Sequence, residues 1–339
     1  GASRLAALAG VSSLVIGLTV VAYGTSAPEL AVSLKSALHG QSDIALGNVV
    51  GSNIFNVLFI LGLCALILPL KVDSQLVRLD VPIMIGVSLL LMVLSLDGSL
   101  GFLDGALLFG GVVSYTAFAV IKSRRETKAV KEEFDQEFAP PADHSAKTML
   151  WNLGLLVVGL VLLVWGARLF VDAAITVAEA LGVSQLVIGL TIVAAGTSLP
   201  EVATSVVATI RGERDIAIGN VVGSNIFNIL SVLGSASMAS PVNIAPAALA
   251  VDIPVMIGVA LICLPIFFTG LLIRRWEGLV FFGLYVLYTA YLILSANGSP
   301  TLPAFTKIVL FGVLPVVALV LSGTALLEFR ERARNASQA

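Results

Sequence analysis

Two glutamates stand in apolar sequence, where a charge is costly. Glu29 and Glu201 lie within long hydrophobic segments, and each directly follows a proline, Pro28 or Pro200. If these segments cross a membrane, a carboxylate at that depth costs several kcal/mol unless it is paired or protonated, and no lysine or arginine stands in the apolar segment that follows each of them. Packing gives no reason for an acid at either position. A bound cation would supply the missing charge.

Hydroxyl and amide side chains accompany both glutamates at helical spacing. Each glutamate follows a Thr-Ser pair by three or four residues, which on a helix places hydroxyl and carboxylate oxygens on one face. The next apolar segment of each copy carries a stripe of polar side chains spaced four residues apart. These stripes are Asn48, Ser52 and Asn56, and Asn220, Ser224 and Asn228. Carboxylate, hydroxyl, amide and carbonyl oxygens are together the ligands of hard cations such as Ca²⁺ and Na⁺.

The two prolines predict a helix break beside each glutamate. Proline cannot donate a backbone hydrogen bond and clashes with the carbonyl four residues earlier, so the carbonyls of Gly24 and Gly196 should be freed. A freed carbonyl inside a bilayer must find a partner, and a cation in a protein-lined cavity is one.

Other small or polar residues have a structural interpretation. Glycines at four-residue spacing are typical of close contacts between membrane helices, and here they are Gly47, Gly51, Gly219 and Gly223. Four aspartates stand at expected helix starts, where N-capping or compensation of the helix dipole explains them. They are Asp43, Asp80, Asp215 and Asp252. For Asn53 and Asn225, structural and ion-binding roles both stay open.

The composition is that of a polytopic membrane protein. Of the 339 residues, 58% are hydrophobic and 12% charged, and the mean hydropathy is +1.03, so too few polar groups exist to cover a soluble surface. The net charge of -2 offers no basic field for nucleic acid. Cys64 and Cys263 fit as apolar packing residues, and His39 and His144 lack partners at zinc-ligand spacing.

Ten apolar spans are expected, all of them helices, because an apolar run of this length satisfies its backbone groups in lipid only by helical bonding. Their approximate bounds are 13–38, 43–69, 80–96, 101–122, 150–171, 184–210, 215–239, 250–270, 276–295 and 304–327. The last span has no counterpart in a repeat and is expected to add packing or oligomer contacts.

The chain contains an internal duplication with an offset of 172 residues. Residues 11–31 match 183–203 at 16 of 21 positions, and 43–58 match 215–230 at 14 of 16. One offset holds five spans, and because five is odd, each span of the second copy should cross in the opposite direction to its counterpart. The second copy also begins with an apolar run near 151–170, so we expect a further helix of about 20 residues before residue 1.

The charges of the loops predict which ends of the spans face the cytoplasm. If the connection 123–149 is cytoplasmic, alternation places 16 of the 19 lysines and arginines on the cytoplasmic side, as the positive-inside rule requires. The C-terminal tail is then cytoplasmic too. The expected organisation is a first repeat at 1–122 lacking its first helix, a solvated linker at 123–149, a second repeat at 150–296, and an additional transmembrane helix with its tail at 297–339.

Two motifs present in both halves resemble the alpha-repeats of the Na⁺/Ca²⁺ exchanger family, within the Ca²⁺:cation antiporter superfamily. They are Gly-Thr-Ser-x-Pro-Glu and Gly-Asn-Val-Val-Gly-Ser-Asn-Ile-Phe-Asn, and the resemblance covers about residues 1–296. It implies an all-helical core of two inverted five-helix repeats around a central ion site. By position it assigns ion coordination to Thr25, Ser26, Glu29, Ser52, Asn56, Thr197, Ser198, Glu201, Ser224 and Asn228.

The resemblance implies a secondary antiporter, and some alternatives to this function stay open. Many members of the family have an aspartate where this chain has Asn228, so Glu29 and Glu201 are the only acids of the expected site. Two carboxylates neutralise one Ca²⁺ but leave an excess of +1 with three Na⁺. We expect Ca²⁺ to exchange for Na⁺ without any cofactor; a Ca²⁺/H⁺ antiporter or, with much less support, an intramembrane enzyme are the alternatives. A K⁺ requirement and the oligomeric state stay open.

Overall fold

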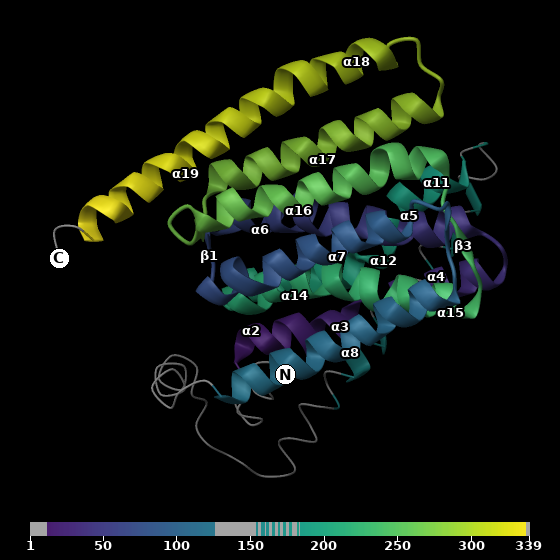
Figure 1. Ribbon diagram of the computed structural model, residues 1–339, viewed down its shortest axis with the longest axis horizontal. Helices are drawn as coiled ribbons and strands as arrows, with labels where there is room; N and C mark the ends of the chain where they lie inside the picture. Colours follow the sequence, from purple (N-terminus) through teal and green to yellow (C-terminus); the bar gives the residue numbers. More distant parts are fainter. Residues whose placement is uncertain are drawn as a thin grey trace.

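The computed structural model describes residues 12–125 and 184–336, with isolated positions between 154 and 182. Within these residues the protein is a bundle of long helices (Figure 1). In this described part, seven helices are long and apolar enough to cross a membrane, and the number of spans is nine if each of two bent helix pairs counts as one span. Nine of the ten expected spans are thus confirmed. The tenth, 150–171, falls where only isolated positions are described, and residues 1–11 and 126–149 lie outside the described part.

The elements of the first half are α2 (Ser13–Ile16), η1 (Gly17–Val21), α3 (Ala22–Thr25), α4 (Ala27–Leu38), α5 (Ser42–Phe55), η2 (Asn56–Leu61), α6 (Gly62–Ile67), β1 (Leu70–Lys71), η3 (Leu76–Asp80), α7 (Val81–Leu94), β2 (Ser99–Leu100) and α8 (Phe102–Arg125). Those of the second half are α11 (Gln185–Ile188), η4 (Gly189–Val193), α12 (Ala194–Thr197), α13 (Leu199–Ile210), α14 (Arg214–Phe227), η5 (Asn228–Leu233), α15 (Gly234–Ala239), β3 (Val242–Asn243), η6 (Ala248–Asp252), α16 (Ile253–Phe268), β4 (Leu272–Ile273) and α17 (Arg275–Ala296). The chain ends with α18 (Leu302–Ile308), η7 (Val309–Val313) and α19 (Leu314–Ala336).

The η elements are π-helical turns, which occur mostly as single turns inside α-helices and often mark functional sites. Three of them, η1, η2 and η3, recur as η4, η5 and η6 at the same offset of 172 residues that relates the sequences. The duplication therefore extends from the sequence to local irregularities of the backbone.

Two long spans form the centre of the bundle. In the span from α5 to α6, 78% of the most apolar stretch is buried, and in the span from α14 to α15 all of it is buried. The last helix, from α18 to α19, has only 6% of its apolar stretch buried, and it runs along the edge of the bundle with its C-terminal end extending past the other helices (Figure 1). Polar side chains on α5 and α14 are thus shielded from lipid, whereas the last helix lies beside the core.

Four two-residue strands show how the halves are oriented, and the all-helical expectation did not include them. β1 pairs antiparallel with β4, and β2 with β3. The counterpart of β1 at the 172-residue offset is β3, which lies one membrane span away from β4. Because β1 pairs with β4 rather than with β3, corresponding connections lie at opposite ends of the bundle. This is the arrangement required of inverted repeats.

The prediction that Asp80 and Asp252 lie at helix starts is wrong. Their spans begin four residues earlier, at Leu76 and Ala248, because the π-helical turns η3 and η6 continue directly into α7 and α16. Instead of capping, each carboxylate accepts a hydrogen bond from a tyrosine of the following span, at 3.1 Å in both cases. The two aspartates therefore link neighbouring spans.

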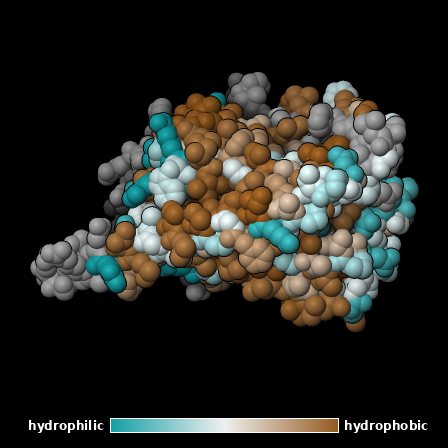
Figure 2. All heavy atoms as spheres, turned by 90° about the horizontal axis from the view of Figure 1, so that it is seen from above, coloured by the Kyte–Doolittle hydropathy of each residue, from teal (hydrophilic) through white to brown (hydrophobic). Residues whose placement is uncertain are grey.

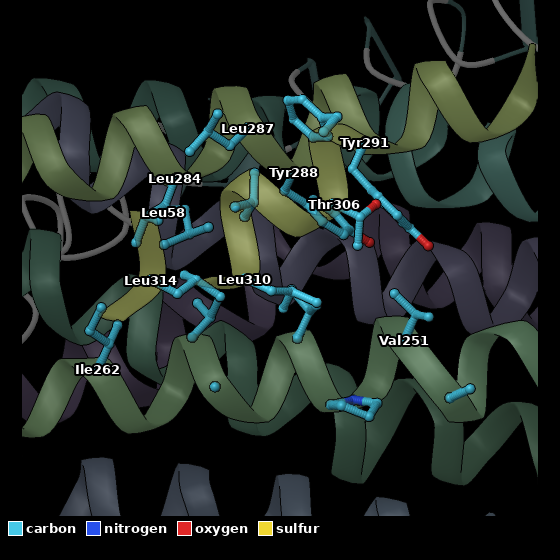
Figure 3. A pocket seen from close by; sticks show the side chains of 17 residues that line it. Leu58, Val251, Ile262, Leu284, Leu287, Tyr288, Tyr291, Thr306, Leu310 and Leu314 are labelled. Carbon is cyan, nitrogen blue, oxygen red and sulfur yellow. The ribbon is translucent and has the colours of Figure 1, made fainter. Parts of the chain in front are cut away.

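The surface agrees with a membrane location. Apolar residues cover most of the face shown in Figure 2, and hydrophilic residues are densest toward its right-hand end. A cavity of about 510 Å³ lies between α16, α17 and the last helix, lined by apolar residues such as Leu58, Ile262, Leu287 and Leu310 (Figure 3). None of the described residues that line it carries a charge.

Candidate functional site

The expected helix breaks are present beside both glutamates. The helix axis bends by 45° between Thr25 and Ala27 and by 44° between Thr197 and Leu199. Each proline then occupies the first turn of the following helix, where its missing N–H is not needed. Glu29 and Glu201 consequently lie in the first turns of α4 and α13, inside the protein and with no exposed surface.

The two breaks contact each other through reciprocal hydrogen bonds between the halves. Ser26 Oγ donates to Glu201 Oε1 at 2.9 Å, and Ser198 Oγ donates to Glu29 Oε1 at 2.8 Å. Sequence spacing had placed each serine on the same face as the glutamate of its own copy. The structure pairs it with the glutamate of the other copy, because the inverted repeats bring the two breaks together at the centre.

Four oxygen atoms at this centre are buried and have no hydrogen-bond partner among the described residues. They are Glu29 Oε2, Glu201 Oε2, Asn56 Oδ1 and Asn228 Oδ1. Buried acceptors are normally satisfied, and leaving one unpaired costs about 1–3 kcal/mol. The atoms form two pairs related by the 172-residue offset, and each belongs to a residue that the sequence indicated. A set of unpaired oxygens with two formal negative charges is the environment that a hard cation requires.

The two threonine hydroxyls beside the glutamates have acceptors for their hydrogens in the opposite half of the protein. Thr25 Oγ1 donates to Asn220 Oδ1 at 3.1 Å, and Thr197 Oγ1 donates to Asn48 Oδ1 at 2.9 Å. A hydroxyl that donates elsewhere keeps its lone pairs available to a cation. Ser52 contacts the carbonyl oxygen of Ala194 at 3.4 Å.

All ten sequence-predicted site residues have no exposed surface, and they are contributed by the two broken spans and the two central spans. Ser224 Oγ completes the set at 3.4 Å from Glu201 Oε1. Among the described residues, no three His, Cys, Asp or Glu side chains lie together so that they could hold a metal ion, and any ion here would rely on two acids and on neutral oxygens.

Two asparagines of the central spans were absent from the expected ligands, although they lie in the same polar stripes. Asn48 Nδ2 donates to the backbone oxygen of Glu29 at 3.2 Å and to Ser33 Oγ at 2.8 Å, and Asn220 Nδ2 donates to Ser205 Oγ at 3.0 Å. Both amide oxygens accept from the threonine of the opposite half. Asn48 and Asn220 thus hold the broken helices against the central spans.

Comparison with known proteins agrees with this geometry. The family model described as sodium/calcium exchanger protein matches residues 1–121 and 151–294. The putative antiporter CaxA of Alkalimonas amylolytica is 42% identical, over 77% of this chain and 81% of its own length. The sodium/calcium exchanger MaX1 of Methanosarcina acetivorans is 37% identical, over 86% and 91%.

Structural comparison gives the same result. The solved structure of the sodium-calcium exchanger NCX_Mj superimposes with a TM-score of 0.70 and 33% sequence identity, over 85% of this chain and 90% of that one. The inverted-repeat fold, the paired motifs and the family match therefore lead to one conclusion. The chain belongs to the sodium/calcium exchanger family and is a multi-pass membrane antiporter of cations, a transporter rather than an enzyme.

Proposed function

We propose that the protein exchanges Ca²⁺ for Na⁺ by presenting one central site alternately to the two sides of the membrane. The observation that carries this proposal is the set of four buried, unpartnered oxygens, two of them from carboxylates. Their formal charge of -2 matches one Ca²⁺. The names of the relatives support the same pair of ions, since MaX1 is a sodium/calcium exchanger and NCX_Mj structures were obtained in Na⁺ with Ca²⁺ or Sr²⁺.

Within this site, Glu29 and Glu201 supply the charge, and Asn56 and Asn228 supply neutral oxygens that have no other partner in the described part of the chain. The remaining proposed ligands are hydroxyls, which can accept a cation while donating their hydrogens elsewhere. They are Thr25, Ser26, Ser52, Thr197, Ser198 and Ser224. No separate cofactor is part of the proposal.

A Ca²⁺/H⁺ antiporter is the second candidate, because the site holds only two acids. Two protons on Glu29 and Glu201 would neutralise the site in exchange for one Ca²⁺, whereas three Na⁺ would leave an excess of +1. The serine hydroxyls that donate to both glutamates stabilise their charged forms, which are the forms that a metal cation binds.

Proteoliposomes loaded with Na⁺, Li⁺, K⁺ or choline distinguish the two candidates. We expect an outward Na⁺ gradient to drive uptake of radioactive Ca²⁺, because Na⁺ leaving the site resets it for the next Ca²⁺. Vesicles loaded with choline and given only a pH gradient should show no uptake above the leak of protein-free vesicles. Equal uptake in choline-loaded vesicles would instead favour exchange for protons, and uptake dependent on both Na⁺ and K⁺ would add K⁺ to the transported ions.

We also propose that the C-terminal tail and the central connection are cytoplasmic. The two strand pairs place the connections around β1 and β4 at one end of the bundle, and those around β2 and β3 at the other. The charge distribution assigns the first end to the cytoplasm. Asp73 and Asp97 are exposed at opposite ends and make the same local contact, each accepting from the backbone N–H two residues later.

A single cysteine at either position tests this orientation. Asp97→Cys should react with a membrane-impermeant maleimide in intact cells, and Asp73→Cys only after permeabilisation. The natural cysteines Cys64 and Cys263 are fully buried, so the unsubstituted protein is the background control. The reverse labelling pattern would mean that the protein inserts in the opposite orientation.

A further inference from the structure

Asn53 and Asn225 occupy the same position in the two copies, where the central spans α5 and α14 meet. Their side chains are 2% and 3% exposed. Asn53 Nδ2 donates to the backbone oxygen of Asn225, and Asn225 Nδ2 donates to the backbone oxygen of Asn53, both at 3.2 Å. A backbone carbonyl oxygen can only accept, so it fixes which end of each side-chain amide faces it.

A second contact to each amide nitrogen agrees with this orientation. Asn53 Nδ2 lies 3.6 Å from Met256 Sδ, and Asn225 Nδ2 lies 3.6 Å from Met84 Sδ. A thioether sulfur is a weak acceptor with no hydrogen to donate. Both contacts of each nitrogen are therefore with acceptors, and the amide oxygens must point the other way.

The two amide oxygens meet the asparagines of the candidate site. Asn225 Oδ1 accepts from Asn56 Nδ2 at 3.0 Å, and Asn53 Oδ1 accepts from Asn228 Nδ2 at 3.1 Å. Since the amide nitrogens of Asn56 and Asn228 make these hydrogen bonds, their amide oxygens face the other way. These oxygens are the two buried side-chain amide atoms that have no hydrogen-bond partner among the described residues.

We infer that Asn53 and Asn225 are positioning residues, which hold the amides of Asn228 and Asn56 with their oxygens rather than their N–H groups toward the transported ion. This inference rests on the proposed function of the site. Each half positions the ligand of the other half, so the orientation depends on contact between α5 and α14. Without the fixed acceptor, a ligand amide could reverse and present N–H groups that a cation repels.

The test uses the difference between an amide and a carboxylate. Asn225→Leu removes the acceptor for Asn56 and should raise the Ca²⁺ concentration for half-maximal transport about tenfold, which corresponds to one lost hydrogen bond to a buried group. The maximal rate per folded protein should stay within about threefold. A carboxylate needs no such orientation, because both ends are oxygens. With Asn56→Asp already present, adding Asn225→Leu should therefore leave the half-maximal concentration unchanged or lower it.

A lower half-maximal Ca²⁺ concentration is expected because the carboxylate introduced by Asn56→Asp would face Asn225 Oδ1. Both groups are hydrogen-bond acceptors and repel each other. Leucine at position 225 removes that repulsion. The mirrored variants, Asn53→Leu with and without Asn228→Asp, repeat the test in the other half. They replace the first pair of variants if that pair does not yield folded protein. Size-exclusion chromatography in detergent identifies the folded fraction of every variant.

An equal increase in half-maximal Ca²⁺ concentration with and without Asn56→Asp would overturn the positioning role. So would a loss of folded protein or maximal rate with an unchanged half-maximal concentration, since that result identifies a purely structural brace between α5 and α14. Failure of the proposed function looks different. In that case the unsubstituted protein itself would show no saturable Ca²⁺ transport in Na⁺-loaded vesicles.

Discussion

Replacing Glu29 or Glu201 by glutamine is expected to reduce Ca²⁺ transport about a hundredfold or more. Each substitution removes one of the two negative charges from a fully buried site, where water cannot replace the lost compensation. Glutamine keeps the size of the side chain and can still accept from the serine of the opposite half. Its second terminal atom, however, becomes an N–H donor where Glu29 or Glu201 has a bare oxygen. The charge and the geometry of the site are lost together.

Transport of Ca²⁺ into Na⁺-loaded proteoliposomes measures this effect over a range of Ca²⁺ concentrations. Asp252→Asn is the matched control, because Asp252 is also a buried acid within a membrane span but contacts Tyr288 instead of the site. Its asparagine can still accept from the tyrosine, so transport should remain within about threefold of the unsubstituted protein. Near-normal transport by both glutamine variants would show that the ion does not bind between these helices.

The location of the candidate site could be proposed from the sequence because its signals are local. An acid beside a proline in apolar sequence has few structural explanations, and the 172-residue duplication presents the same combination twice. Burial of Glu29 and Glu201 and the bends beside them follow from these signals. The number of spans per repeat, an odd number, also sufficed to predict the inverted topology, which the pairing of β1 with β4 now supports.

The partners of the site residues could not be predicted, because they depend on how the two halves meet. Spacing within one copy suggested that Ser26 lies with Glu29, whereas it donates to Glu201. The role of Asn53 stayed open for the same reason, since its amide contacts belong to the other half of the chain. The prediction for Asp80 was wrong because the span begins with a π-helical turn that includes Asp80 itself, and sequence periodicity does not indicate such a turn.

Gly51 and Gly223 lie where the two halves pack closely, and a substitution there should have the next largest effect. A Cβ atom at Gly51 would lie 2.6 Å from the carbonyl oxygen of Leu190, and at Gly223 it would lie 2.5 Å from that of Leu18. Both neighbours are backbone atoms of the π-helical turns that lead into the broken helices, so no side chain can rotate to make room. This confirms the packing interpretation of these glycines.

Gly51→Ala and Gly223→Ala are therefore expected to lower the free energy of unfolding by about 1–3 kcal/mol or more, as overpacking of a fixed backbone does. They should also reduce transport, because separating α5 from η4, or α14 from η1, displaces the breaks that hold the glutamates. Thermal unfolding in detergent and Ca²⁺ uptake measure the two effects. Gly86→Ala and Gly258→Ala are the controls, since a Cβ there meets nothing within 4 Å and alanine favours a helix, so stability should be unchanged or slightly higher. If all four variants behaved alike, contact between the halves at these glycines would not be what holds the broken helices in place.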